Sequence, residues 1–193
     1  GIVANGELDR LAKAGELVVG GEPRISKEKR SIGVSIDLMG GGPKKLIGYR
    51  AKRYTRIIDL ALVNHYDPLE FWDTIYFHGQ KALILDPNEF YILATQETVR
   101  VPPRFAAEMI AYDITVGEFR VHYAGFFDPG FGYGAGADSK AVLEVRSHEV
   151  PFMLEHGQTI GWLRYERMAG VPDRLYGGRI ASNYQGQGLA LAK

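Results

Sequence analysis

Short runs of alternating apolar and polar residues, separated by glycine and proline clusters, constrain the fold of this chain more than any other feature. Alternation with a period of two is typical of strands with one buried face, and the clusters between the runs predict turns. The strands expected from this pattern are residues 32–38, 44–49, 82–85, 90–94, 98–101, 108–112, 119–125, 141–146 and 159–165. The sequence therefore predicts an all-β barrel, sandwich or jelly roll.

Three other segments depart from the strand pattern. Apolar residues recur at helical spacing near the N-terminus, at Leu8, Leu11 and Ala12. We expect Asn5 to cap this one short helix and Gly15 to end it. Residues 66–78 are rich in aromatic side chains and are compatible with either a helical turn or a loop. Residues 182–193 are rich in Gly, Gln and Ala, which predicts a mobile C-terminal arm.

Length and composition predict one globular domain over residues 1–193. Of the 193 residues, 46% are hydrophobic and 24% are charged, which is typical of a folded domain. The chain has no cysteine, which excludes disulfides, thiolate catalysis and a cysteine-ligated zinc. It has neither a signal peptide nor an apolar run of the roughly 18 residues that a membrane helix needs, so we expect a cytoplasmic protein. Because it begins with Gly1, it can also be a piece of a longer two-domain protein.

Charge is balanced overall but not along the chain. Lysine plus arginine and aspartate plus glutamate both number 23, so no net field recruits nucleic acid or an anionic membrane. Residues 1–54 carry 11 basic and 6 acidic side chains, a net of +5, and the remainder carries 12 and 17, a net of −5. No aromatic residue is interleaved with the basic ones before Tyr49 and Tyr54. A solvated face, or a surface that docks onto acidic protein, is therefore favoured for the basic stretch.

Two motifs are better explained by structure than by function. Residues 40–45, Gly-Gly-Gly-Pro-Lys-Lys, resemble a phosphate-binding loop. They lack the G-x-x-x-x-G-K-[ST] spacing and a following helix, so we expect a hairpin turn. His148 and His156 have acidic neighbours, but Pro151 argues against a helix that would bring both imidazoles to one face. We therefore expect no metal site and no bound zinc.

Residues 120–146, RVHYAGFFDPGFGYGAGADSKAVLEVR, form the most informative segment. A D-P-G turn follows an apolar strand there and leads through a glycine-rich loop into the next strand. Alternation in that strand places Glu144 on the same face as Val142 and opposite Leu143 and Val145. If both faces are covered, the carboxylate of Glu144 is desolvated, its pKa rises, and it suits a proton shuttle. Spacing alone supports a structural salt bridge equally well.

The turn F-F-D-P-G-F-G and the strand A-V-L-E-V after it resemble the turn and V-L-E strand of the dCTP deaminase and dUTPase superfamily. An opening helix, the segment SIGVSIDLMG and the C-terminal NYQGQG are similar to deaminase features in the same order. The resemblance therefore spans nearly the whole chain. It is greatest to the C-terminal half of the long dCTP deaminases of some bacteria, in which two such domains are fused.

The resemblance implies a β-clip fold, a dUTPase-like distorted jelly-roll barrel. It implies a homotrimer with active sites between subunits, or a fused homologous domain in place of a second subunit. The implied reaction is hydrolysis of deoxycytidine triphosphate to dUTP and ammonia in pyrimidine deoxynucleotide metabolism. The chemical step uses no zinc or other catalytic metal, and Mg²⁺ accompanies the triphosphate.

The resemblance also implies the site residues. Glu144 matches the catalytic glutamate that relays protons between water, ring N3 and the leaving amine. The positions that match substrate-binding residues are His122, Gly125, Asp128, Tyr184 and Gln187. His122 and Gly125 match the strand that lines the base pocket, although the spacing from His122 to Asp128 is one residue shorter than usual. Asp128 matches an aspartate that lies near the deoxyribose. Tyr184 and Gln187 match a C-terminal segment that closes over the nucleotide.

One stretch departs from the family pattern. Related proteins carry an R-S-S-x-x-R-like phosphate motif before the histidine strand, whereas residues 112–118 here read Y-D-I-T-V-G-E. Asp113 and Glu118 would repel a triphosphate by a few kcal/mol at close range unless Mg²⁺ intervenes. We expect another domain to supply the missing motif.

Two alternatives to the deaminase stay open. A dUTPase-type diphosphohydrolase would use Asp128 to activate water for attack on phosphate and would release pyrophosphate rather than ammonia. A non-catalytic partner domain would keep the fold and complete another domain's site. The absent phosphate motif favours the partner domain, and the Glu144 strand and the Tyr184–Gln187 tail argue against it.

Overall fold

The structure, a computed structural model, describes residues 1–111, 119–122, 125–134, 138–177, 186, 188–189 and 191. Strands dominate these residues, which confirms the predicted all-β class. The elements are α1 (Asn5–Lys13), β1 (Val18–Val19), β2 (Arg24–Ser26), β3 (Ser31–Ser35), β4 (Leu46–Ala51), η1 (Pro68–Glu70), β5 (Trp72–Tyr76), β6 (Ala82–Leu85), β7 (Phe90–Val99), β8 (Phe105–Ala111), β9 (Phe119–His122), β10 (Phe126–Phe127), β11 (Ser139–Ser147), β12 (Phe152–Glu155) and β13 (Thr159–Arg167).

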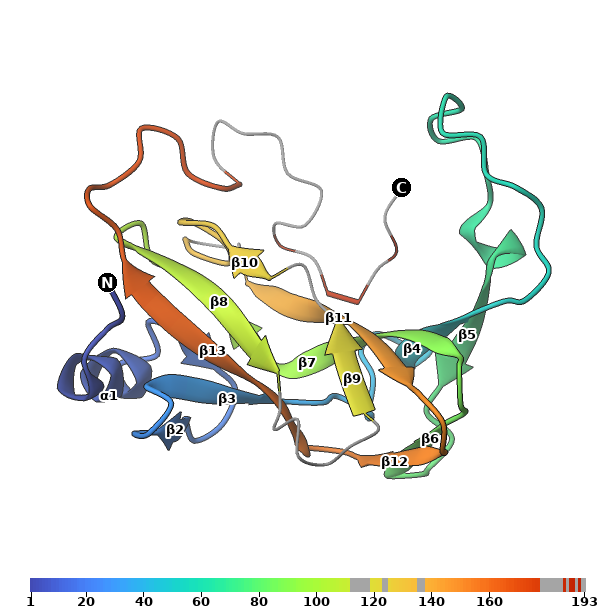
Figure 1. Cartoon of the computed structure of the whole chain (residues 1–193), viewed down its shortest axis with the longest axis horizontal. Coiled ribbons are helices and arrows are strands. Elements are labelled where there is room, and N and C mark those ends of the chain that lie inside the picture. Colours follow the sequence, from blue (N-terminus) through green and yellow to red (C-terminus); the bar gives the residue numbers. More distant parts are fainter. Residues whose placement is uncertain are drawn as a thin grey trace.

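The strands form two larger sheets and one small one (Figure 1). One larger sheet has the order β5-β4-β7-β11-β9, with β1 also paired to β7, and the other has the order β10-β8-β13-β3-β2. The small sheet consists of β12 and β6. The two larger sheets share one hydrophobic core, to which they contribute Val34, Leu93, Met109, Leu143 and Leu163 among others. This arrangement agrees with the expected distorted jelly roll.

Helix α1 forms where the sequence predicts it, but Asn5 does not cap it. The N-cap is Ala4, and Asn5 is the first helical residue, whose Nδ2 donates a hydrogen bond to the Lys27 carbonyl at 3.0 Å. At the other end, Gly15 has a φ of 69° and donates to the carbonyl of Ala12. A positive φ there favours glycine, so the predicted C-terminal end is confirmed.

Several strand boundaries differ from the prediction. Residues 90–94 and 98–101 were expected as separate strands, but β7 is one strand of 10 residues that contains the first and ends at Val99, inside the second. For residues 66–78 the sequence allowed a helical turn or a loop. The structure has the short helical turn η1 there, followed by strand β5, which was not expected. The hairpin turn over residues 40–45 is confirmed, because Gly41 bridges Leu46 and the Lys45 N–H donates to the Gly42 carbonyl.

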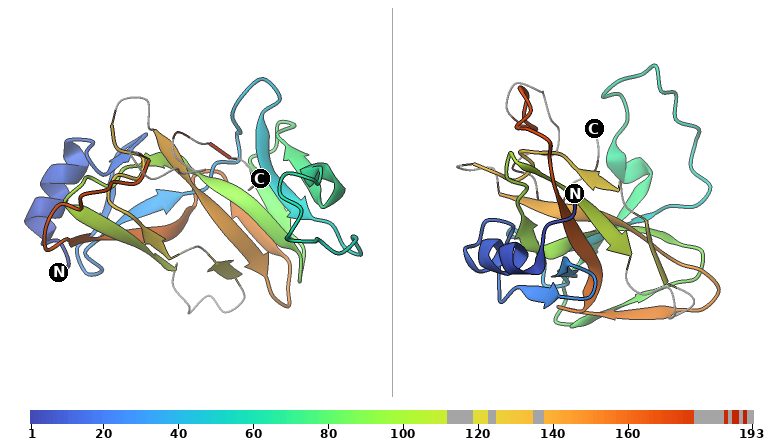
Figure 2. Two further views of the ribbon diagram at one scale, coloured as in Figure 1. Left: turned by 90° about the horizontal axis from the view of Figure 1, so that it is seen from above. Right: turned by 60° about the vertical axis from the view of Figure 1, so that its left-hand side comes forward.

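One segment leaves the body of the molecule. Between β4 and β5 the chain makes a long excursion that Figure 2 shows projecting away from the sheets. Among the described residues, no helix is long and apolar enough to cross a membrane.

Candidate active site

Glu144 lies on the outward face of β11, as strand alternation predicts. Leu143 and Val145 are buried in the core, whereas Val142 is half-buried and Glu144 is exposed. The predicted choice of face is therefore confirmed. Among the residues that the structure describes, none covers the carboxylate of Glu144, so the condition for its desolvation is not met by that part of the chain. A substrate or a neighbouring domain would have to supply that cover.

The sheet register places a row of residues level with Glu144. Its direct partners are His122 on β9 and Ile92 on β7, and Ile92 in turn pairs with Tyr49 on β4. Directly opposed residues of antiparallel strands share one face of a sheet. The structure thus brings the backbone of His122 beside Glu144, as expected for two strands of one pocket; the His122 side chain lies outside what the structure describes.

Aromatic side chains flank this row on the same sheet. The rings of Trp72 and Phe90 lie 6.0 Å apart, and the guanidinium of Arg146 lies 5.7 Å from the Phe90 ring centroid. All three side chains remain partly accessible. The outward face therefore combines flat apolar surface with a carboxylate and a cation, which suits a ligand that has a ring and an anionic group.

The turn that carries Asp128 is fixed by backbone contacts. Gly130 donates to the Val101 carbonyl at 2.8 Å and Phe131 donates to the Asp128 carbonyl at 3.1 Å. Gly130 has a φ of 101°, and a Cβ there would lie 2.8 Å from the Tyr176 carbonyl oxygen. Only glycine fits this position, which explains the D-P-G pattern.

Asp128 itself is exposed at the end of β10. Strand β10 pairs with β8 in the second sheet, and Gly125, just before β10, accepts a hydrogen bond from the Met109 N–H at 3.2 Å. The structure thus places Gly125 and Asp128 on a different sheet from Glu144, although the chain reaches β10 directly after β9. Tyr184 and Gln187, the two predicted tail residues, lie outside the described residues.

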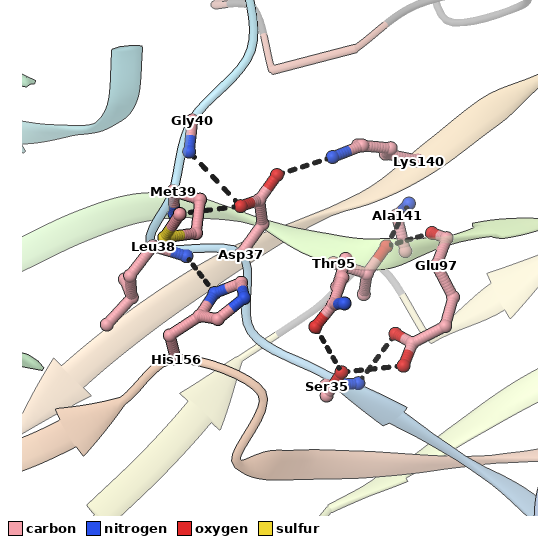
Figure 3. A network of polar contacts seen from close by, with 11 residues as sticks. Ser35, Asp37, Leu38, Met39, Gly40, Thr95, Glu97, Lys140, Ala141 and His156 are labelled. Carbon is pink, nitrogen blue, oxygen red and sulfur yellow. Dashed lines mark hydrogen bonds and ion pairs between the residues drawn. The ribbon is translucent and has the colours of Figure 1, made fainter. Parts of the chain in front are cut away.

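A buried polar junction joins β3 of one larger sheet to β7 and the start of β11 in the other (Figure 3). Glu97 is buried, 8% exposed, and its carboxylate accepts the Ser35 N–H at 2.7 Å and the Ser35 hydroxyl at 2.6 Å. Thr95 Oγ1 donates to the Glu97 carbonyl at 2.8 Å and accepts the Ala141 N–H at 3.0 Å. These contacts satisfy the groups that an irregular strand register would otherwise leave unpaired.

That irregular register is a bulge between β7 and β11. The pairing changes from Lys140 with Thr98 to Val142 with Ala94, so β7 has three residues, 95–97, opposite Ala141 alone. Because Thr95 holds the Ala141 N–H, the bulge stays in place and the outward face of the following residues is fixed. Thr95 is therefore a positioning residue for the strand that presents Glu144.

An ion pair and a cavity lie at the start of β11. Lys140 Nζ lies 2.6 Å from Asp37 Oδ2, while Asp37 Oδ1 accepts the N–H groups of Met39 and Gly40 at 2.9 and 3.1 Å (Figure 3). Burial raises the pKa of Asp37, but the contact with Lys140 and the two backbone hydrogen bonds outweigh it and leave the pKa below its ordinary value. Asp37 is thus a carboxylate at neutral pH.

The cavity beside this pair has a volume of about 270 Å³. It is lined by Asp37, Gly41, Gly42, Leu46, Ile47, Ala94, Lys140, Gly188 and Leu189. Gly186 donates to Ser139 Oγ at 2.9 Å, so the described tail residues pass directly over the start of β11. The tail therefore reaches the strand of Glu144, as a segment that closes over a ligand would.

Sequence reasoning did not single out Asp37, Thr95, Glu97 or Lys140. Asp37 stands inside the quoted segment SIGVSIDLMG, but its partner Lys140 is 103 residues away. Glu97 could have been noticed because it occupies an inward-facing position of strand β7. A charged side chain at such a position is expected to have a hydrogen-bonding or charged partner.

One of the two histidines that the sequence singled out, His156, makes a structural contact. His156 Nδ1 accepts the Leu38 N–H at 3.1 Å, which explains its position without a metal. Among the described residues, no three His, Cys, Asp or Glu side chains gather as metal ligands. Residues 112–118, which depart from the phosphate motif, lie outside the described residues.

Comparison with known proteins identifies relatives for nearly the whole chain. A family model described as 2'-deoxycytidine 5'-triphosphate deaminase, C-terminal domain, matches residues 4–193. A dCTP deaminase, dUMP-forming, from Beutenbergia cavernae is 31% identical over 149 residues, which cover 73% of this chain and 74% of that protein. A protein of the same name from Streptomyces griseus is 30% identical over 73% of this chain and 75% of its own length. Both names give dUMP as the product, where the sequence resemblance implied dUTP.

A solved structure is similar as well. The crystal structure of 2'-deoxycytidine 5'-triphosphate deaminase from Agrobacterium tumefaciens has a TM-score of 0.79 and 50% sequence identity over 89% of this chain. The match covers 50% of that protein, so this chain spans about half the length of the solved relative.

Proposed function

The chain belongs to the family of the dCTP deaminase C-terminal domain, and we propose that it carries out the hydrolytic deamination of dCTP. The observation that carries the proposal is the outward position of Glu144, on a face with aromatic and cationic neighbours and beside the backbone of His122.

In this reaction Glu144 takes a proton from water and delivers protons to ring N3 and to the leaving amine. Water adds to C4 of cytosine, the C4–N bond breaks, and ammonia leaves. A positioned acid–base group of this kind contributes about 10²–10⁴-fold to a rate. The aromatic face around Phe90 and Trp72 would hold the base and keep bulk water from the carboxylate.

The triphosphate needs ligands that residues 112–118 do not offer. We propose that a second homologous domain, in a trimer or fused in a longer chain, supplies these ligands and that Mg²⁺ accompanies the phosphates. Charge-assisted hydrogen bonds contribute about 1.5–3 kcal/mol each, so without two or three of them binding would weaken roughly 10³-fold. A cytoplasmic location stays a prediction.

The names of the two curated relatives favour a second candidate, in which the product is dUMP. That reaction also cleaves the bond between the α- and β-phosphates with a second water, so dCTP yields dUMP, ammonia and pyrophosphate. The two reactions share the Glu144 step and differ only in the second hydrolysis.

One assay tests both candidates. The chain is incubated with dCTP and Mg²⁺, ammonia is measured with a coupled enzyme, and the nucleotides are separated by anion-exchange chromatography. We expect slow ammonia release from the chain alone and faster release when a homologous domain with the arginine and serine motif is added. Appearance of dUMP with pyrophosphate selects the second candidate; pyrophosphate from dUTP without ammonia from dCTP would contradict deamination.

A further inference from the structure

A second cavity lies at the end of the molecule that holds helix α1. Its volume is about 380 Å³, within the range of about 300–1,000 Å³ that is typical of small-molecule sites. Figure 1 shows α1, the start of β8 and the end of β13, which all contribute to it, at the left-hand end of the molecule. The described residues that line it lie outside β4, β7, β9 and β11, the strands that carry Glu144 and its row. The proposed reaction uses none of them.

Three arginines from different parts of the chain line this cavity. Arg10 comes from α1, Arg104 from the turn before β8, and Arg167 from the end of β13. The acidic residues in the lining are Glu7 and Glu16, so three positive and two negative side chains leave a net charge of +1. Like charges gathered in one cavity repel one another unless an anion lies between them. The charge of this cavity therefore favours an anionic ligand.

Two of the arginines have donors to offer. Arg104 is exposed, and within the described part of the chain its side chain has neither an ion pair nor a hydrogen bond. Arg10 lies 3.8 Å from Glu16, which is longer than a hydrogen bond, and both side chains keep much of their solvent contact. A guanidinium carries five N–H donors in a planar fork. Both side chains can therefore bind an anion without losing a strong contact.

The third arginine is already held in place. Arg167 pairs with Glu7, and its guanidinium lies 5.2 Å from the Phe105 ring centroid. The Met168 N–H donates to the Arg104 carbonyl at 2.9 Å, which keeps the turn of Arg104 beside the end of β13. Groups that are fixed before binding lose less entropy when a ligand arrives. The cationic side of the cavity is thus partly preorganised.

The rest of the cavity wall is apolar. Tyr133 and Val171 line it and are 42% and 54% exposed, and Pro102, Pro103 and Leu11 complete the wall. Proline has a fixed φ and no N–H, so two adjacent prolines give a rigid surface without backbone donors. A tyrosine ring packs well against another flat apolar body. The cavity therefore joins anion-binding donors to a surface that accepts a ring.

We propose that this cavity binds a small organic phosphate, with the phosphate group between Arg104 and Arg10 and the ring against Tyr133. A phosphate monoester offers three acceptor oxygens and nearly two negative charges, so two arginines from different elements can share it. The guanidinium fork matches two phosphate oxygens at once, which a lysine ammonium does not. The site involves neither Glu144 nor deamination, so the proposal does not depend on the proposed function.

Calorimetric titration with phenyl phosphate tests the site. Inorganic phosphate and benzyl alcohol are titrated as probes that each carry only one half of the ligand. Phenyl phosphate should bind the wild-type chain at least about 10-fold more tightly than inorganic phosphate, because the ring adds apolar contact, and benzyl alcohol should show no saturable binding. Phenyl phosphate that does not bind, or that binds no more tightly than inorganic phosphate, would overturn the proposal.

Two variants and a control locate the binding. Arg104→Gln should weaken phenyl phosphate about 10-fold or more, the effect of losing one charge-assisted contact. Tyr133→Ala should weaken phenyl phosphate but leave inorganic phosphate unchanged. The matched control is Arg30→Gln, which removes another exposed arginine, in the turn between β2 and β3 and outside the cavity, and should keep the wild-type affinity.

A melting curve shows that each variant folds. If Arg104→Gln binds phenyl phosphate as the wild type does, or if Arg30→Gln loses as much affinity, the phosphate binds elsewhere and the proposal is wrong. Because the probe carries no base and no reaction is measured, failure of this test is distinct from failure of the deamination assay.

Discussion

The two sides of strand β11 differ in burial and in the way their polar groups are satisfied. On the inward side Leu143 and Val145 are fully buried, and at the start of the strand the polar groups of Thr95 and Glu97 are paired by hydrogen bonds. On the outward side Glu144 is exposed and its neighbours are only half covered. The inward side fixes the register of the strand, and that register leaves a carboxylate on a surface that a ligand or a second domain can cover.

A second contrast separates the polar junction from residues 52–65, the exposed segment between β4 and β5. The junction buries charged and hydroxyl groups and satisfies them, which is required because an unpaired buried polar group costs about 1–3 kcal/mol. Residues 52–65 expose apolar groups such as Ile57 and Leu60, which no other described residue covers. Exposed apolar surface of this kind is unfavourable in water, whereas the satisfied polar groups of the junction are not.

Truncating a side chain on each side of β11 should give the largest difference in stability. Leu143→Ala removes a fully buried side chain and should lower the free energy of unfolding by about 2–5 kcal/mol. The outward neighbour Val142→Ala should cost less than about 1 kcal/mol, because its side chain is only half-buried. Urea unfolding of both variants measures the loss in the free energy of unfolding. Equal losses would mean that the two sides of β11 do not differ in burial.

The junction can be tested at Thr95. Thr95→Val keeps the shape but leaves the Ala141 N–H without its acceptor, so we expect a loss of about 1–3 kcal/mol in the free energy of unfolding. Thr95→Ser keeps the hydroxyl and serves as the matched control. If the serine variant is as unstable as the valine variant, the methyl group rather than the hydrogen bond holds the bulge.

The ion pair at the start of β11 should show a smaller effect with a defined pH dependence. Asp37→Asn removes the charge that Lys140 faces and should cost about 1–2 kcal/mol at neutral pH, since both side chains keep some solvent contact. The pKa of Asp37 is below its ordinary value of 3.8 in the folded chain. The stabilisation is therefore complete above pH 3.8 and is lost as the pH falls through the folded-state pKa. The difference in the free energy of unfolding between the wild type and Asp37→Asn should therefore disappear as the pH falls below 3.8, which urea unfolding at several pH values measures. A difference that stays constant with pH would contradict the assigned charge of Asp37.

Removal of the tail should have the smallest effect on stability. A chain that ends after Ala181 loses the contact of Gly186 with Ser139 but little apolar surface, so the melting temperature should move by only about 1–2 °C. Affinity for dCTP should fall more, because a segment that orders over a ligand adds late contacts. Calorimetry measures the melting temperature, and nucleotide titration measures the affinity for dCTP. A large drop in melting temperature would show that the tail stabilises the fold itself.

The fold was predictable from the sequence where a strand has a clear inner and outer face. Strands β11 and β13 appear close to their expected bounds, because most of their residues alternate between more and less buried positions. Strand β6 has its expected bounds as a short apolar run, although its burial does not alternate. Strand β5 was not predicted as a strand, since all five of its residues are half-buried and its alternation is weak. Strands β1 and β2, of two and three residues, are too short for any period to be visible.

The candidate site was predictable only in part. Glu144 and the D-P-G turn follow from local patterns, in which alternation and turn chemistry act over a few residues. The pairing of Asp37 with Lys140 and of Ser35 with Glu97 depends on segments 103 and 62 residues apart. No local pattern encodes such contacts, because they arise only when β3, β7 and β11 meet.

The role of Glu144 is tested most directly by Glu144→Gln, assayed for ammonia release from dCTP with the homologous domain that supplies the phosphate ligands. Glutamine keeps the shape of the side chain on an exposed position but cannot relay protons. The rate should fall about 10²–10⁴-fold, while nucleotide affinity and melting temperature stay close to those of the wild type. Glu166→Gln, at another strand glutamate, should keep the full rate. A Glu144→Gln variant that retains more than about a tenth of the wild-type rate would show that another group carries the proton transfer.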